Sequence, residues 1–326
     1  MALLGRRDGR NFGYGRQLSY AGRQALEDLY AGGHFATVKA HGDRWQAFVR
    51  WCRSEEGPDY NDARQIDRQT LNDYAAYLRR QIQQGALCIA TAQNRLSSVN
   101  RTLAALRGDE NVKIASPSEA IGQQRSTVRK RAPDGQDLQQ VRHVAQVLVE
   151  QKYERAAAIV MLARTTGMRL REAILADLPR LRSEAERLGR INIQDGTKGG
   201  RSGASAQRWI IANEQVNAAL LLARKASPIG SRNLLDRAET YATFLHQSVL
   251  PARKILRECG LKGFHELRSA YACERYEQIT DYAAPVHSGH SYLMDRSLDQ
   301  KARLKISREL GHNRIDVVSS YIGGRT

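Results

Sequence analysis

The sequence has few aromatic residues, few cysteines and no long apolar segment. Phe, Trp and Tyr make up 6% of its 326 residues, so it offers little of the aromatic platform on which RNA-binding proteins stack bases. Four cysteines lie far apart without a C-x-x-C pair: Cys52, Cys88, Cys259 and Cys273. This usage is typical of free thiols in a reducing compartment. Because no apolar run approaches the roughly 18 residues of a membrane span and no secretory signal opens the chain, we expect a cytoplasmic protein.

Sites for common cofactors are also missing. The sequence shows no Walker-type phosphate loop and no cluster of carboxylates that would indicate a metal. His287-Ser-Gly-His290, with Cys273 upstream, has a ligand-like spacing, but nothing else supports a zinc site. We therefore expect neither a cofactor nor a metal.

Positive charge is present in excess and is spread over the chain. Lys and Arg number 51 against 34 Asp and Glu, and the formal net charge is +17. Residues 1–133 carry 21 basic and 13 acidic side chains, which leaves 30 and 21 for the remainder. Two basic halves favour a polyanion held from both sides, with a merely soluble basic protein as the alternative.

The pattern of apolar residues predicts a mainly α-helical fold with one small β-hairpin. Residues 1–16 are rich in Gly and Arg and are interpreted as a disordered basic arm, and residues 17–122 as a bundle of about four helices. Residues 123–133 form a predicted basic linker along an anion, and residues 134–326 a second domain. Thr70 and Asp73 resemble a capping box that opens a helix.

The hairpin of the second domain is predicted to carry a long basic tip. Ile191–Ile193 and Trp209–Ile211 are the convincing strands, and the Gly/Ser-rich loop of residues 195–207 between them contains Lys198 and Arg201. The segment 280–300 resembles an insertion between two helices. It fits a lid, a contact with a neighbouring subunit or a tolerated loop.

The end of the sequence places a tyrosine shortly after a glycine-histidine pair. Leu310-Gly311-His312 is typical of a helix stop, and Tyr321 follows nine residues after the histidine. Two upstream clusters carry the groups that a tyrosine nucleophile needs, one over residues 166–172 and one over residues 265–268. Together these three segments indicate a site for attack on a phosphodiester.

Cleavage of a phosphodiester by a tyrosine needs several partners, because the pKa of a phenol is about 10. Guanidinium groups suit the negative charge of the non-bridging oxygens. The leaving sugar oxygen needs an acid such as Lys, and the phenol proton needs an acceptor such as His. The chain offers at least one residue for the nucleophile, the phosphate ligands, the acid and the base: Tyr321, Arg169, Arg268, Lys198, His265 and His312.

Each of these residues alone has an ordinary structural explanation. Arg169 fits a solvated helix face, and His265 with Arg268 at i, i+3 spacing fits a structural pair. Tyr321, next to apolar neighbours, fits a core aromatic. Their joint occurrence in one order, on a basic protein with a helical N-terminal half, favours the functional interpretation.

The same three segments resemble the signature of tyrosine recombinases, the phage-type integrases, and the resemblance implies the integrase of a bacterial mobile element. The matching residues are Thr166-Gly-x-Arg169-x-x-Glu172, His265-x-x-Arg268 and Leu310-Gly311-His312 with Tyr321. Residues of about 136–326 resemble the catalytic domain of that family. Residues of about 17–120 resemble, more loosely, its SAM-like core-binding domain.

The resemblance implies a role for each residue of the signature. Tyr321 would form a 3′-phosphotyrosyl link, Arg169 and Arg268 would clamp the phosphate, and Lys198 would be the general acid, with Arg201 leaving the register open. His265 would be the general base and His312 a hydrogen-bond donor to the phosphate, while Glu172 would orient the site from behind. Five further residues would contact DNA: Arg125, Arg129, Lys130, Arg131 and Arg201.

As a whole, the resemblance implies a clamp on double-stranded DNA that carries out site-specific strand exchange near the nucleoid. A homotetramer would assemble on two DNA sites, with an accessory directionality factor as a further partner. Because the chain ends five residues after Tyr321, we expect subunit coupling through another element, such as the segment 280–300. A type IB topoisomerase or telomere resolvase, or a non-catalytic regulator derived from an integrase, are the alternatives.

Overall fold

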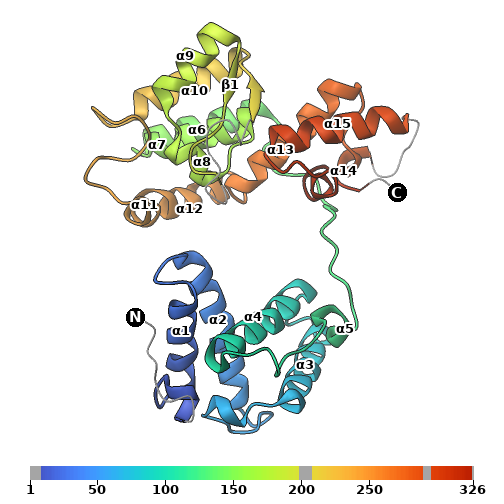
Figure 1. The fold of residues 1–326 in the computed structure, drawn as a ribbon. Helices are drawn as coiled ribbons and strands as arrows, with labels where there is room; N and C mark the ends of the chain where they lie inside the picture. Colours follow the sequence, from blue (N-terminus) through green and yellow to red (C-terminus); the bar gives the residue numbers. More distant parts are fainter. Residues whose placement is uncertain (1–8, 198–207, 289–294, 325–326) are drawn as a thin grey trace. The chain divides into compact units, whose positions relative to one another are not determined.

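Two compact helical units make up the chain. The computed structural model describes residues 9–197, 208–288 and 295–324. The units are Met1–Ser126 and Thr127–Thr326, and each has its own apolar core. Helices dominate both units (Figure 1), as the apolar periodicity predicts. In these described ranges no helix is both long and apolar enough to cross a membrane.

The first unit is a bundle of helices. Its helical segments are η1 (Arg10–Gly13), α1 (Leu18–Leu29), α2 (Phe35–Cys52), η2 (Ala63–Gln65), α3 (Arg68–Gln83), α4 (Ile89–Arg107) and α5 (Pro117–Ile121). Aromatic side chains of α2 and α3 fill its core, where Phe48 lies edge-on to Tyr74 at 4.9 Å between ring centroids. Trp45 is fully buried, and its Nε1–H donates to the carbonyl of Leu18 at 3.0 Å. This bond ties α2 to the start of α1.

The prediction of a disordered arm over residues 1–16 is wrong for residues 9–16. Asn11 is fully buried there, and its backbone N–H donates to Oδ1 of Asp62 at 2.9 Å. Its side-chain oxygen accepts from the backbone N–H of Ala63 at 2.7 Å. The hydrogen-bond partners of Asn11 lie more than 50 residues away in the sequence. The local Gly/Arg composition therefore could not indicate that this segment is ordered.

The predicted capping box at Thr70 and Asp73 is also wrong, since the helix begins earlier. Asp67 is the N-cap of α3, and its carboxylate accepts from the backbone N–H of Thr70 at 2.8 Å. The Thr70 hydroxyl in turn accepts from the backbone N–H of Asp67 at 3.4 Å. The reciprocal pair is therefore one turn upstream of the predicted one.

Gly22 and Gly42 provide a matched test of the α1–α2 packing. A Cβ at Gly22 would lie 2.0 Å from Nε1 of Trp45, whereas nothing lies within 4 Å of a Cβ at Gly42. We expect Gly22→Ala to lower the free energy of unfolding by about 1–3 kcal/mol through overpacking. Gly42→Ala should raise it by about 0.5–1 kcal/mol, because Ala is the better helix former. Chemical denaturation of both variants measures these free energies. Equal shifts of the unfolding free energy in one direction would contradict the close packing of Gly22 against Trp45.

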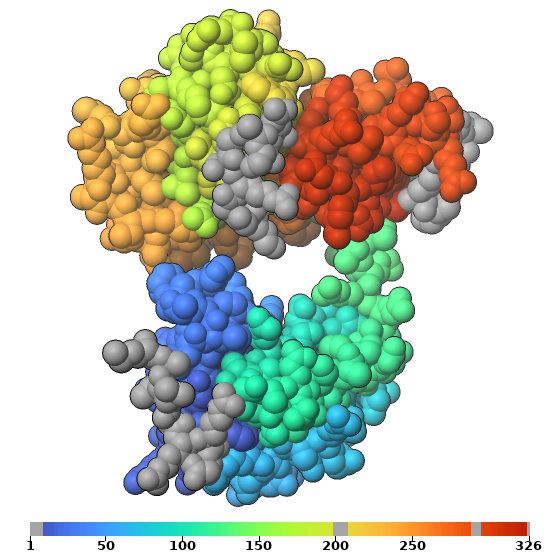
Figure 2. All heavy atoms as spheres, viewed as in Figure 1, coloured from blue at the N-terminus to red at the C-terminus, as the bar shows by residue number. Residues whose placement is uncertain are grey.

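The second unit contains the remaining elements. They are α6 (Leu138–Glu150), α7 (Glu154–Thr166), α8 (Leu170–Leu175), α9 (Leu178–Leu188), β1 (Arg190–Asn192), β2 (Trp209–Ile211), α10 (Glu214–Ala226), α11 (Tyr241–Phe244), η4 (Leu245–Val249), α12 (Leu250–Glu258), α13 (Phe264–Thr280), α14 (Pro285–Ser288), α15 (Arg296–Glu309), η5 (Asp316–Val318) and α16 (Ser319–Ile322). The C-terminal helices, red, lie on the opposite side of this unit from α11 and α12, orange (Figures 1 and 2).

Helix α7 is the centre of the second unit. Every residue from Ala156 to Thr166 is buried, and α6, α10 and α13 pack around it. The helix ends at Gly167, which has a φ of +64° and a site where a Cβ would lie 2.6 Å from the ring of Tyr271. A glycine is required here, and the sharp turn that it permits delivers Arg169 to the start of α8.

The predicted hairpin strands are confirmed. β1 and β2 pair antiparallel, with Ile191 opposite Ile210, and they lie within one residue of the predicted spans. The tip of the loop, including Lys198 and Arg201, lies outside the described residues. Glycine again permits a close approach at the C-terminus, where a Cβ at Gly323 would lie 2.9 Å from the backbone nitrogen of Val286. Helix α14, inside the segment 280–300, therefore packs against the chain just after Tyr321.

Candidate active site

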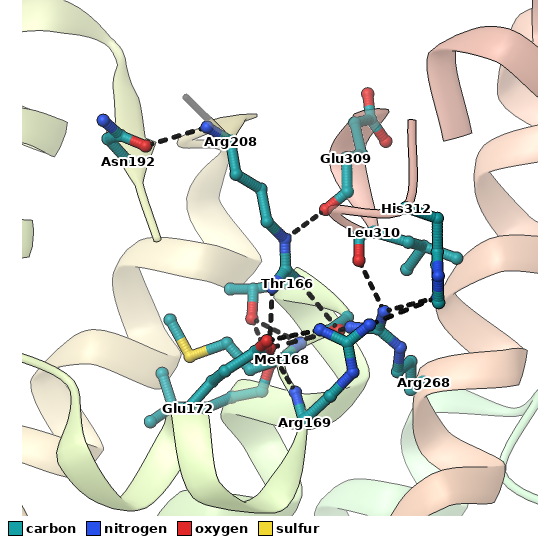
Figure 3. A network of polar contacts seen from close by, with 12 residues as sticks. Thr166, Met168, Arg169, Glu172, Asn192, Arg208, Arg268, Glu309, Leu310 and His312 are labelled. Atoms are coloured by element: carbon teal, nitrogen blue, oxygen red, sulfur yellow. Dashed lines mark hydrogen bonds and ion pairs between the residues drawn. The ribbon is translucent and has the colours of Figure 1, made fainter. Parts of the chain in front are cut away.

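Four separated segments bring the residues of the candidate site together. Arg169 is the N-cap of α8, directly after the turn that ends α7. Arg268 lies on α13, His312 follows the end of α15, and Tyr321 lies on the short helix α16. Figure 3 shows Arg169, Arg268 and His312 pointing toward one another from these elements. Among the described residues that the sequence analysis grouped by chemistry, Arg169, Arg268, His312 and Tyr321 are thus neighbours in space.

Tyr321 is 5% exposed, and its hydroxyl is directed into the cationic cluster. The hydroxyl oxygen lies 2.9 Å from Nε2 of His312, and it accepts from Nε–H of Arg268 at 3.4 Å. The Arg268 guanidinium carbon lies 5.4 Å from the centroid of the phenol ring. A guanidinium beside the oxygen favours a developing phenolate, which is the charge that a nucleophilic tyrosine must bear.

Arg268 is held rigidly by backbone carbonyls. It is 1% exposed, donates from Nη2 to the carbonyl of Leu310 at 2.6 Å, and donates from Nη1 to the carbonyl of Gly167. These two carbonyls belong to the turn after α7 and to the end of α15. A single side chain therefore joins the two segments that carry Arg169 and His312.

Glu172 supplies the negative charge behind the arginines. Its carboxylate is fully buried and pairs with Arg169 at 2.6 Å, with Arg208 at 2.6 Å and with Arg268 at 3.7 Å. Burial by itself raises the pKa of Glu172, but the charges of Arg208, Arg268 and Arg169 outweigh it and hold the pKa at about 2. One carboxylate faces three guanidiniums, so positive charge remains for an anion such as a phosphate.

His312 Nε2 acts as an acceptor in this arrangement. Arg169 Nη2 and Arg268 Nη2 each lie 3.3 Å from it, and guanidinium groups can only donate. Its tautomer, assigned from these partners, therefore carries the proton on Nδ1. Burial, then the charges of Arg268 and Arg169, lower the pKa of His312 to about 4, and a neutral imidazole 2.9 Å from the Tyr321 hydroxyl is placed to take its proton.

His265 lies on the other side of the tyrosine. Its ring meets that of Tyr321 edge to face, with 5.6 Å between the centroids. The side chain is exposed, yet burial of part of its ring and the charge of Arg268 lower the pKa of His265. Within the described part of the chain, the histidine nitrogen hydrogen-bonded to the phenol is that of His312, so the predicted base role of His265 stays a prediction.

Arg208 is a residue of this site that the sequence analysis missed. It is 3% exposed, and it donates from Nη1 to Glu172 at 2.6 Å and from Nη2 to the carbonyl of Gly167 at 3.0 Å. Its Nε–H donates to the carbonyl of Glu309. An arginine at the entrance of a strand carries no local signal, because its burial depends on the three segments that meet around it. Glu172 is the residue that points to Arg208, because a buried carboxylate can pair with more than one cation.

The predicted DNA contacts on the linker fall into two groups. Arg125, Lys130 and Arg131 are exposed. Arg129 is instead turned inward, where its guanidinium pairs with Glu266. Its predicted role as a phosphate ligand would require exchange of that partner.

A basic cavity of about 470 Å³ opens beside the arginine cluster. Its charged and titratable lining comes from α8, α12 and α13 and the turn before α13, and comprises Arg169, Arg253, Arg257, Lys262, His265, Glu266 and Arg268. Five of these seven side chains are Lys or Arg and one is Glu. The cavity therefore extends the positive surface away from Tyr321 in the manner of a groove for a chain of phosphates.

Loss of Arg208 should destabilise the second unit. Arg208→Met leaves the buried Glu172 short of a partner, and breaking a buried ion pair costs about 3–5 kcal/mol. Arg190→Met is the matched control, because Arg190 is exposed on the same hairpin and stacks on Trp209 at 4.4 Å. Its loss should cost about 1 kcal/mol or less. Urea unfolding measures both, and a small loss for Arg208→Met would show that Glu172 is held by its other partners alone.

The pKa of His312 predicts how stability depends on pH. The pKa falls from an ordinary 6.5 to about 4 in the folded protein, so the unfolded chain binds a proton more readily between these values. Stability from this group is complete above about pH 6.5 and is lost as the pH falls toward 4. We expect His312→Gln to lose less stability than the wild type between about pH 7 and about pH 4.5 in urea unfolding. Equal losses would contradict the lowered pKa.

Comparisons with known proteins bear on the family and the fold of the chain. Residues 122–274 match a family model described as Integrase. The Tn1549 transposon integrase, solved in complex with transposon right end DNA, is similar over 94% of this chain and 95% of that chain, with a TM-score of 0.56 and 13% identity. A lambda integrase tetramer bound to a Holliday junction aligns over 86% of this chain and 76% of that chain, with a TM-score of 0.48 and 18% identity. No curated protein matches this chain.

These matches differ in what they cover. The integrase match contains Arg169, Arg208 and Arg268 and ends before His312 and Tyr321. The likeness to the Tn1549 protein spans nearly the whole chain, and at 13% identity it establishes a shared fold. The roles of the last two residues therefore rest on their contacts in this structure.

Proposed function

We propose that the chain is a tyrosine recombinase, a site-specific enzyme that cleaves and rejoins duplex DNA through Tyr321. The observation that carries the proposal is the Tyr321 hydroxyl, 2.9 Å from a neutral His312 and 3.4 Å from Arg268. The phenol oxygen attacks the phosphorus, forms a 3′-phosphotyrosyl bond and releases a 5′-hydroxyl. Its proton passes to an imidazole, and the leaving oxygen takes a proton from an acid for which Lys198 is our candidate.

The two signature arginines act on the phosphate. Arg169 and Arg268 carry the charge that matches the non-bridging oxygens. When the phosphate binds, its oxygens replace His312 as the acceptor for the Nη2–H groups of Arg169 and Arg268. The imidazole is then released to accept from Tyr321 or, as the other tautomer, to donate to the phosphate. His265 remains a second candidate for the base, since its ring lies against the same phenol.

DNA binding is supported by the basic side chains of the second unit. The cavity with Arg253, Arg257 and Lys262 would hold phosphates next to the scissile one, and exposed Lys130 and Arg131 of the linker would hold phosphates farther away. Residues 17–122 would act as the core-binding domain and residues 134–326 as the catalytic domain. Such binding should weaken steeply with salt.

Assembly follows from the chemistry of exchange. Two duplexes have four strands to cut, and each protein chain offers one Tyr321, so four copies on two sites form the active complex. The segment 280–300 is our candidate for subunit coupling, because α14 packs beside the tyrosine segment. An accessory directionality factor and association with the nucleoid complete the proposal.

The first test is the trapping of a covalent adduct. Wild-type protein, incubated with fragmented DNA of its source genome, should give SDS-resistant and protease-sensitive adducts, and sequencing the trapped DNA should identify the site. Tyr321→Phe should abolish the adduct and retain DNA binding. Tyr153→Phe, which alters the N-cap of α7 at the end of that helix away from Arg169, is the matched control and should leave the adduct unchanged.

The remaining outcomes separate the alternatives. Adducts that persist in Tyr321→Phe would refute the assignment of the nucleophile. Salt-sensitive binding without any adduct would favour a non-catalytic regulator. Products that join ends of one site, and never of two, would favour a topoisomerase or a telomere resolvase.

A further inference from the structure

The segment that enters the second unit lies against the helix of the nucleophile. The backbone N–H of Arg129 donates to the carbonyl of Ser319 at 2.9 Å. Ser319 is the first residue of α16 and stands two positions before Tyr321. Val128 lies against the chain just after this helix, since a Cβ at Gly324 would lie 2.9 Å from its Cγ1. Residues 128 and 129 therefore contact the chain on both sides of Tyr321.

The side chain of Arg129 binds a second element, α13. Its Nη2 pairs with the carboxylate of Glu266, and its Nη1–H donates to Oγ of Ser269 at 3.2 Å. Glu266 and Ser269 are the residues directly after His265 and Arg268 in the sequence. Arg129 thus joins the face of α13 next to the catalytic candidates to the helix that carries Tyr321.

The contacts of Arg129 are stronger than those of an exposed ion pair. The side chains of Arg129 and Glu266 are 15% and 18% exposed, so solvent screens their attraction less than it would at the surface. Glu266 also accepts from the backbone N–H of Asp134 at 3.2 Å, which fixes the segment at a second point. The Nε–H of Arg129 donates to the carbonyl of Arg131 at 2.8 Å. The guanidinium is therefore engaged on all three nitrogens.

We propose that Arg129 is a positioning residue that sets the place of Tyr321 through Ser319 and Glu266, so that the conformation of the interdomain segment controls the nucleophile. The proposal rests on the proposed function of Tyr321. It replaces the prediction that Arg129 binds a DNA phosphate. The neighbouring Lys130 is exposed and keeps that role, so DNA held by the segment would act on Tyr321 through the adjacent Arg129.

The first test compares Arg129→Gln, Glu266→Gln and the double variant with the wild type. Each single variant should slow single-turnover formation of the covalent adduct on the order of tenfold, since small displacements of a reacting atom are costly. The double variant should be no slower than the slower single variant, because both changes break one contact. The affinity of Arg129→Gln for DNA and its dependence on salt should stay within about twofold of the wild type. Glu266→Gln removes a negative charge from the lining of the basic cavity, so this variant should bind DNA at least as tightly as the wild type. Arg129→Lys, which keeps the charge for Glu266, should restore part of the rate.

Lys130→Gln provides the contrasting behaviour. Loss of an exposed phosphate ligand should weaken DNA binding and reduce the slope of log Kd against log salt by about one. If Arg129→Gln behaves in this way while Glu266→Gln does not, Arg129 is a phosphate ligand and the proposal is overturned. Additive losses of rate in the double variant would also overturn it.

A measurement without DNA separates this proposal from the function of Tyr321. Hydrogen exchange of the amides of residues 315–324 in the free protein should be faster in Arg129→Gln and in Glu266→Gln, while exchange in the buried helix α7 stays unchanged. Unchanged exchange over residues 315–324 would refute the positioning role even if adducts form. Faster exchange in a protein whose wild type forms no adduct would support the contact and refute the catalytic assignment alone.

Discussion

The buried carboxylate of Glu172 is the anion around which the cationic site is built. Three guanidiniums lie within 3.7 Å of this carboxylate. Without the carboxylate they could not share a buried environment, because their mutual repulsion and their loss of hydration would both oppose folding. With it, Arg169, Arg208 and Arg268 approach one another from three elements. Glu172 itself is placed by the helix turn that follows Gly167. Its carboxylate accepts from the backbone N–H of Arg169, and this bond fixes that turn.

The same charge balance prepares the site for a phosphate. Burial and the neighbouring charge of Arg208 lower the pKa of Arg268 to about 10, which still leaves it charged at neutral pH. The same two causes keep His312 neutral, since burial and the cations around it lower its pKa to about 4. The site thus combines permanent cations for an anion with a neutral imidazole for a proton. Both properties come from one cluster, so a change in any member alters the others.

Tyr321, the proposed nucleophile, lies on a helix too short to fold by itself, and neighbouring residues hold this helix in place. The carbonyl of Tyr321 faces the thiol of Cys273 at 3.8 Å, and Arg303 donates to Oγ of Ser319 and to the carbonyl of Gly323, both at 3.2 Å. Arg129 adds the contact from the interdomain segment. A short helix held at several points can shift when one of them changes, which suits the proposed bonding of Tyr321 to DNA and its later release.

The sequence determined the helical class of both units, the hairpin strands and four residues that meet at the site, because periodicity and a spaced signature survive in one dimension. These four residues are Arg169, Arg268, His312 and Tyr321. The sequence also indicated Glu172 as a partner of Arg169, since the two are one helix turn apart. It did not reveal Arg208, the order of Asn11 or the inward turn of Arg129. Each of these depends on a partner between 36 and 137 positions away. Only the tertiary structure decided them, because desolvation and pairing of a polar group are set by the segments that meet around it and not by its neighbours in the chain.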